Sequence, residues 1–156
     1  TDILEVNEVA RAVLTKNTAA LRELVRFQPW LCIHENDFWG PVCNDDEPIG
    51  TEVQAFGYGY CEGFGTRDEE VIMSVIEELV ARTTGVYAVV EDVQEESYGI
   101  VFTTIDNIFA ITVLVEDEGI SWVLFGCGQS PAEALAERNG KIILSPISLE
   151  KDTGDE

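Results

Sequence analysis

Four carboxylates crowd one short stretch of this sequence, VVEDVQEESYG, which covers residues 89–99. They are Glu91, Asp92, Glu95 and Glu96. The runs on either side have the composition of β-strands, so the stretch is predicted to be a tight connection between two strands. Ionised carboxylates are strong hydrogen-bond acceptors for Lys and Arg side chains. An array of them in one turn could therefore bind a basic surface.

A second acidic connection follows two strands later in the chain. The predicted strands are residues 86–91, 99–105, 108–115 and 120–125. The second connection contains Glu116, Asp117 and Glu118. In an up-and-down antiparallel sheet, alternate connections emerge at the same end, and strands two places apart are separated by about 10 Å. We therefore predict that seven acids share one edge, at a spacing comparable with that of nucleic-acid phosphates.

Further acids and aromatic residues lie outside these two turns. The long segment 31–52 is predicted to be an irregular loop, and it carries Asp45, Asp46, Glu47 and Trp39. A tryptophan beside acids could anchor a bound protein, because aromatic residues are enriched at binding hot spots. Two simpler interpretations remain open: the aromatic residues close the loop over the core, and the charged turns are merely solvated.

The whole chain is strongly acidic. Thirty Asp and Glu residues against nine Lys and Arg residues give a formal net charge of −21 over 156 residues. Hydrophobic residues make up 46% of the chain, so the acidity is not that of a disordered tail. Two explanations stay open. The low lysine content favours adaptation of the whole surface to high salt, whereas the concentration of acids in particular segments favours a functional acidic face.

One cysteine has a position that is typical of reactive thiols. In the segment WVLFGCGQSPAEA, Cys127 follows a predicted strand and precedes a predicted helix. A helix N-terminus can stabilise a thiolate, and His34, the single histidine, is the candidate base. The Gly-Cys-Gly frame nevertheless differs from a nucleophile elbow, and many such cysteines only pack in a core. We predict no catalytic residue, with a thiol enzyme using Cys127 as the alternative.

A metal site is the second chemical alternative. Its candidate ligands are Cys32, His34, Cys43 and Cys61. Structural zinc sites are usually built from Cys or His pairs with two to five intervening residues, and these gaps fit neither pattern. No EF-hand calcium loop is present. The absence of a phosphate-binding loop, a dinucleotide fingerprint and a basic patch disfavours direct binding of nucleic acid. We therefore predict no cofactor and no metal, and leave binding by these four residues open.

Apolar spacing predicts helices that accompany the four strands. The helical segments are residues 2–14, 19–27, 66–85 and 130–140. Asn17 or Thr18 is expected to cap the second helix, Thr66 the third and Ser130 the fourth. The predicted fold is α+β, a four-stranded antiparallel meander with an N-terminal helical hairpin and two further helices packed on one face. Residues 1–149 form the single predicted domain, and residues 150–156 form an acidic tail.

The sequence also carries expectations about location. No run of about 18 apolar residues is present, so no membrane span is expected. The N-terminal segment TDILEVNEVARAV lacks a basic region followed by an apolar one, so no secretory signal is expected. The irregular spacing of the four cysteines does not resemble a dense disulfide framework. We therefore expect reduced cysteines and a cytoplasmic protein.

These observations predict a non-enzymatic acidic protein that binds a basic partner. In charge and size the chain is similar to small acidic proteins that act as phage-encoded antagonists of host defence, some of them DNA mimics, and to immunity proteins that neutralise a nuclease. No motif carries that likeness. The expected partner is a nucleic-acid-binding protein or a nuclease, whose basic surface the acids would occupy. The alternative is a salt-adapted domain.

Overall fold

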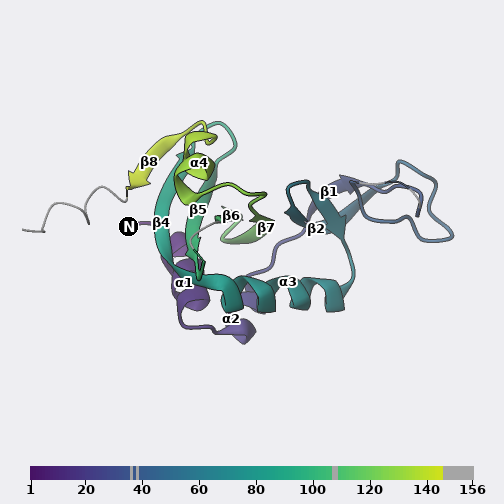
Figure 1. Ribbon diagram of the computed structural model, residues 1–156. Helices are drawn as coiled ribbons and strands as arrows, with labels where there is room; N and C mark the ends of the chain where they lie inside the picture. Colours follow the sequence, from purple (N-terminus) through teal and green to yellow (C-terminus); the bar gives the residue numbers. More distant parts are fainter. Residues whose placement is uncertain (36, 38, 107–108, 146–156) are drawn as a thin grey trace, which may run out of the picture.

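The computed structural model describes residues 1–35, 37, 39–106 and 109–145. The helices are α1 (Leu4–Leu14), α2 (Thr18–Glu23), α3 (Glu69–Arg82) and α4 (Pro131–Ala136). The strands are β1 (Gln28–Leu31), β2 (Glu52–Tyr60), β3 (Phe64–Thr66), β4 (Thr83–Asp92), β5 (Ser97–Thr104), β6 (Ile111–Glu116), β7 (Gly119–Phe125) and β8 (Lys141–Leu144). Figure 1 shows helices α1, α2 and α3 beneath the sheet, with the long connection between β1 and β2 projecting to one side.

The strands form one mixed sheet of eight strands in the order β1-β2-β7-β6-β5-β4-β8, with β3 paired to β2. Strand β2 runs parallel to β7, and every other pair of named strands is antiparallel. The prediction of a four-stranded antiparallel meander is therefore wrong. The four predicted strands are the middle of a larger sheet, because segments distant in sequence add β2 beside β7 and β8 beside β4.

The two faces of the sheet are covered differently. Helices α1, α2 and α3 cover one face, where large side chains such as Phe56, Phe102 and Ile76 are fully buried. Helix α4 belongs to the other face, because Ala134 packs in a separate small cluster with Ala88 and Val101. The prediction that all helices share one face is thus wrong. Ala88 on β4 and Val101 on β5 provide the apolar surface against which α4 packs on the second face.

The predicted N-terminal caps are confirmed at α2 and α4, and the cap predicted for α3 is wrong. The Asn17 side chain accepts a hydrogen bond at the start of α2, and the capping box of Ser130 and Glu133 is formed at the start of α4. Helix α3 begins later than predicted. Its cap is Asp68, whose carboxylate accepts from the first turn, while the Thr66 hydroxyl accepts from the Asp68 amide. A charged oxygen at Asp68 therefore replaces the predicted threonine cap.

The four cysteines form two disulfides, so the expectation of reduced cysteines is wrong. Cys32 pairs with Cys43 within the β1–β2 connection, with 4.9 Å between the Cα atoms. Cys61 pairs with Cys127, with 4.5 Å between the Cα atoms. The second pairing follows from topology. Parallel strands β2 and β7 end side by side, so the residues that follow them are brought together.

Some expectations concern parts of the chain outside the described residues. The predicted acidic tail, residues 150–156, is one of these parts. None of the described helices is both long and apolar enough to cross a membrane.

The two disulfides are expected to differ in their contribution to stability. Their sequence separations are 66 residues for Cys61–Cys127 and 11 residues for Cys32–Cys43. Loop-closure entropy then predicts that the C61S/C127S variant loses about 4 kcal/mol of unfolding free energy and the C32S/C43S variant about 3 kcal/mol. Urea unfolding of both variants measures the difference. Free thiols in unfolded, unreduced wild-type protein would contradict the pairing itself.

Candidate functional site

The two acidic turns lie at the same end of the sheet. The β4–β5 turn covers residues 93–96, and the β6–β7 turn covers residues 117–118. The register pairs Asp92 with Ser97 and Glu116 with Gly119, and strands β5 and β6 pair between the two hairpins. Alternate turns of this antiparallel part therefore emerge together. Their strands are two places apart, which separates the turns by about 10 Å.

Glu91 does not join the other acids of the first turn. Successive side chains of a strand point to opposite faces, so Glu91 lies on the face opposite to that of Asp92. Its carboxylate is 4.0 Å from the Lys141 ammonium on β8. Burial raises the pKa of the neighbouring Tyr98 hydroxyl, and the charges of Glu91 and Glu5 raise it further. Glu91 is therefore part of the helix-covered face.

We call the six remaining acids of the two turns the acidic rim. They are Asp92, Glu95, Glu96, Glu116, Asp117 and Glu118. Hydrogen bonds fix both turns. The Asp92 carboxylate accepts from the Gln94 and Glu95 amides, at 3.0 and 3.3 Å. On the other turn, Arg26 Nε donates to the Asp117 carbonyl at 3.1 Å. The rim is thus held by the backbone rather than by pairing of its carboxylates.

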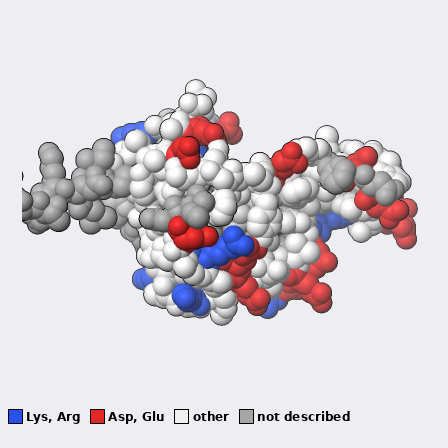
Figure 2. Space-filling view, viewed as in Figure 1, with Lys and Arg blue, Asp and Glu red and all other residues white. Residues whose placement is uncertain are grey.

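The rim borders a groove on the sheet face opposite α1, α2 and α3. The groove has a volume of about 450 Å³ and crosses strands β4 to β7 at the rim end of the sheet. Three rim acids line it, namely Asp92, Glu95 and Glu116, and Leu114 contributes to its apolar lining. In Figure 2 the surface is hollowed between the part over α4 and the part over β1 and β2. The groove therefore combines a concave apolar floor with carboxylates.

Two tryptophans form the wall opposite α4. The rings of Trp30 on β1 and Trp122 on β7 lie 5.0 Å apart, at an angle of 33°. The Trp122 indole lies directly on the backbone, because a Cβ at Gly57 or Gly63 would overlap its ring. The indole nitrogen of Trp122 and the side-chain nitrogen of Gln28 are buried and have no hydrogen-bond partner among the described residues. Such donors are uncommon in folded proteins.

Arg138, just after α4, is the one basic residue among the described residues that line the groove. Its side chain is half-buried and passes over Gly99, with Cδ and Nε 3.9 Å from where a Cβ would stand. Burial lowers the pKa of the Arg138 guanidinium, and the charges of Asp92 and Glu137 partly offset that effect. Within the described part of the chain, its guanidinium forms no hydrogen bond and no ion pair within 4.0 Å. These donors remain available to a bound molecule.

A second hollow continues from the first along the sheet. It has a volume of about 400 Å³ and shares Asp92, Arg138 and Asn139 with the groove. Its far end reaches the Cys61–Cys127 disulfide. The concave face therefore extends on both sides of Arg138.

The predicted loop residues are not part of this groove. Asp45, Asp46 and Trp39 lie on the β1–β2 connection, which projects from the sheet (Figure 1). Trp39 stacks on Phe64, with 6.3 Å between the rings, and is 52% exposed. The structure therefore separates these residues from the rim, although the sequence grouped them as one binding surface.

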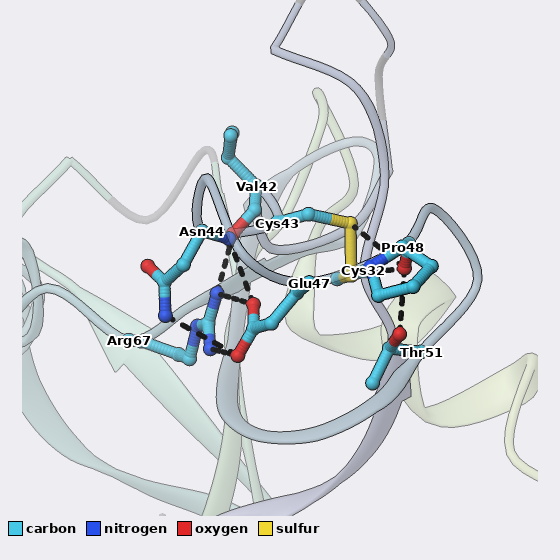
Figure 3. Close-up of a disulfide and its surroundings, with 8 residues drawn as sticks. All are labelled: Cys32, Val42, Cys43, Asn44, Glu47, Pro48, Thr51 and Arg67. Carbon is cyan, nitrogen blue, oxygen red and sulfur yellow. Dashed lines mark hydrogen bonds and ion pairs between the residues drawn. A yellow bond between two sulfur atoms is a disulfide. The ribbon is translucent and has the colours of Figure 1, made fainter.

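Glu47 has a local structural partner. Its two carboxylate oxygens accept from Arg67 Nη1 and Nη2, at 2.9 and 2.8 Å, and one of them accepts from the Asn44 amide at 2.7 Å (Figure 3). The hydrogen bonds from Arg67 and Asn44 lower the pKa of the Glu47 carboxyl to about 2. Together with the Cys32–Cys43 disulfide, this pair fixes the loop.

The metal-site and thiol-enzyme alternatives both need free cysteine thiols, and the cysteines concerned form the two disulfides. Among the described residues, no group of three or more His, Cys, Asp and Glu side chains is placed to hold a metal ion. Cys32, Cys43 and Cys61 are bonded to other sulfurs, so they cannot supply thiolates alongside His34. Cys127 likewise has no thiol in this state.

Comparison of the chain with protein-family models, with curated proteins and with solved structures found no match. The groove's own residues therefore carry the functional argument. Sequence reasoning missed Trp122 and Arg138, and assigned the anchoring role to Trp39. The signal that could have found Trp122 is the alternation of glycine and aromatic residues in segment 56–65, which is typical of a close backbone approach.

The loop ion pair makes a prediction about pH. The folded-state pKa of Glu47 is depressed, from 4.5 to about 2. The pair's stabilisation is therefore complete above pH 4.5 and is lost as the pH falls towards 2. Replacing its partner, R67Q, should raise the Glu47 pKa towards 4.5, as read from carboxyl carbon shifts by NMR. The control R82Q breaks a different ion pair, with Glu78, and should leave Glu47 unchanged. Titration of wild-type Glu47 near pH 4.5 would contradict the pairing.

Proposed function

We propose that this protein binds a basic partner protein without catalysing a reaction, and that it occupies the surface with which the partner binds nucleic acid. The observation that supports this most is the convergence of two acidic turns on one groove. Three of the rim acids line that groove together with Trp30 and Trp122. Charge and aromatic surface thus coincide at one place on the molecule.

The physical mechanism is replacement of phosphates by carboxylates. A protein that binds nucleic acid gains affinity when its Lys and Arg side chains release counterions from the phosphates. A fixed array of carboxylates offers the same side chains a similar exchange. The rim, backed by a net charge of −21, would speed encounter with a basic surface. The tryptophans of the groove would lengthen the lifetime of the complex.

The kind of protein implied is an antagonist or an immunity protein directed at a nucleic-acid-binding protein or a nuclease. The expected cytoplasmic location rested partly on reduced cysteines, and the two disulfides remove that part of its basis. Disulfides are rare in the reducing cytoplasm and typical of oxidising compartments. We therefore propose that the protein binds its partner in an oxidising compartment, where the disulfides persist.

Capture experiments with matched variants test the proposal. The rim variant E95Q/E96Q/E116Q/E118Q neutralises four rim acids, and the control E23Q/E62Q/E70Q/E77Q neutralises four exposed acids elsewhere. Both variants lose the same charge. We expect wild-type and control protein, but not the rim variant, to capture a basic protein from cells of the source organism, with binding that weakens steeply as salt rises.

The captured protein should then lose its own binding to nucleic acid when wild-type protein is added, as measured by displacement of a labelled duplex. Equal capture by the rim and control variants would contradict a specific acidic site. Capture without displacement of the duplex would contradict occupation of the nucleic-acid surface.

A second role, adaptation to high salt, is supported by acids that lie away from the rim. Figure 2 shows Asp and Glu over several separate parts of the surface, including the part around α3 and the outer end of the β1–β2 connection. Exposed acids of α3 include Glu69, Glu70 and Glu77. An acidic surface of this extent would serve solubility rather than recognition.

The dependence of the melting temperature on salt separates the two roles. The Debye length is about 8 Å at 0.15 M salt and about 3 Å at 1 M, so repulsion across the rim is largely screened well below molar salt. For a binding protein we expect the melting temperature to rise at low KCl and then level off. A melting temperature that continues to rise through molar KCl would instead favour salt adaptation. If no partner is captured either, the two results together would contradict the binding role.

A further inference from the structure

The groove has the dimensions of a ligand site. Its volume of about 450 Å³ lies within the range of about 300–1,000 Å³ that is typical of ligand pockets. It crosses the four strands β4 to β7, which spans about 14 Å at ordinary strand spacing. An extended chain advances about 3.3 Å per residue, so about four residues of extended peptide cover this distance.

The residues that line the groove favour a positively charged ligand group. On one side stand the carboxylates of Asp92, Glu95 and Glu116, and on the other the paired rings of Trp30 and Trp122. A guanidinium or ammonium group is attracted both to carboxylates and to the face of an indole ring. Among the described residues, the groove is lined by these three acids and by one base, Arg138, so its charge complements a basic segment.

Arg138 gives the groove a second kind of contact. A cationic side chain would not pair with this guanidinium, but the backbone carbonyls of an extended peptide would, because guanidinium groups are donors only. Arg138 lies over Gly99 and has no acceptor among the described side chains. The groove therefore offers acceptors for a basic side chain and a donor for the backbone beside it.

We propose that the groove binds an extended peptide segment of the partner, with a Lys or Arg side chain between the tryptophan pair and the three carboxylates, and with a backbone carbonyl on Arg138. This inference rests on the proposed binding of a basic partner and names the segment that would enter. The rim acids outside the groove then contribute only long-range attraction.

A titration with a defined peptide tests the proposal. The probe is the capped heptapeptide Ser-Arg-Ser-Arg-Ser-Arg-Ser, and its matched control has citrulline, the neutral analogue of arginine, at the three positions. Each acidic turn supplies at least one acid that lines the groove, such as Glu95 or Glu116, and at least one that does not, such as Glu96 or Glu118. The groove variant is therefore E95Q/E116Q, and the charge-matched control is E96Q/E118Q.

Calorimetry should show saturable binding of the arginine peptide and none of the citrulline peptide. We expect E95Q/E116Q to raise the Kd roughly tenfold and E96Q/E118Q to raise it less than about twofold, because contacts inside a groove exceed screened attraction from outside it. Equal effects of the two variants, or no binding by wild-type protein, would overturn the groove as the site. If partner capture still depends on the rim in that case, the proposed function stands and only this inference fails.

A substitution of Arg138 tests whether this side chain binds a peptide carbonyl or affects binding only through its charge. The variant R138M keeps most of the side-chain length but removes a positive charge from the groove. Attraction by charge alone predicts a lower Kd for the arginine peptide, whereas loss of the carbonyl contact predicts a higher one. We expect a higher Kd. A lower Kd would overturn the role given to Arg138, and unchanged melting of the variant by circular dichroism would exclude a folding defect.

Discussion

The indole of Trp122 lies directly on the backbone of β2, and the concave face of the molecule depends on that contact. Gly57 is the register partner of Trp122 in the parallel pair of β2 and β7, and a Cβ there would overlap the ring. Because β2 can approach this closely, β1 follows on its far side and places Trp30 against Trp122. The same pairing ends both strands together and so brings Cys61 to Cys127. One close approach thus positions the aromatic wall and a disulfide.

The acidic rim depends on a different constraint, which is the antiparallel order of β4 to β7. Alternate turns share an end of such a sheet, so two acidic turns converge without any long-range contact between them. Hydrogen bonds to backbone groups of the two turns hold the turns in place against the repulsion between their carboxylates. Asp92 accepts two amides of its own turn, and Arg26 donates to the carbonyl of Asp117. Glu95 and Glu116 line the groove, where a basic ligand could reach them, and Glu96, Asp117 and Glu118 are exposed.

Local signals in the sequence predicted local structure, and distant partners decided the rest. The capping box at Ser130 and the cap at Asn17 are read from neighbouring residues, and strands β4 to β7 from short β-branched runs. Neither kind of signal reports that β2 lies parallel to β7, since these strands are far apart in sequence, with Gly57 paired to Trp122. The disulfides and the tryptophan wall follow from that pairing, so they escaped the sequence analysis. The rim was predictable because only strand order determines it.

The central claim is that a basic segment enters the groove between the tryptophans and the rim. Proton–nitrogen NMR of the three indole groups, recorded while the arginine heptapeptide is added, tests it most directly. Trp30 and Trp122 line the groove, whereas Trp39 lies in the projecting loop, where it stacks on Phe64 of β3, and serves as an internal reference. The account predicts that the Trp30 and Trp122 signals shift together and saturate, while the Trp39 signal stays in place. A shift confined to Trp39, or equal small shifts of all three, would contradict it.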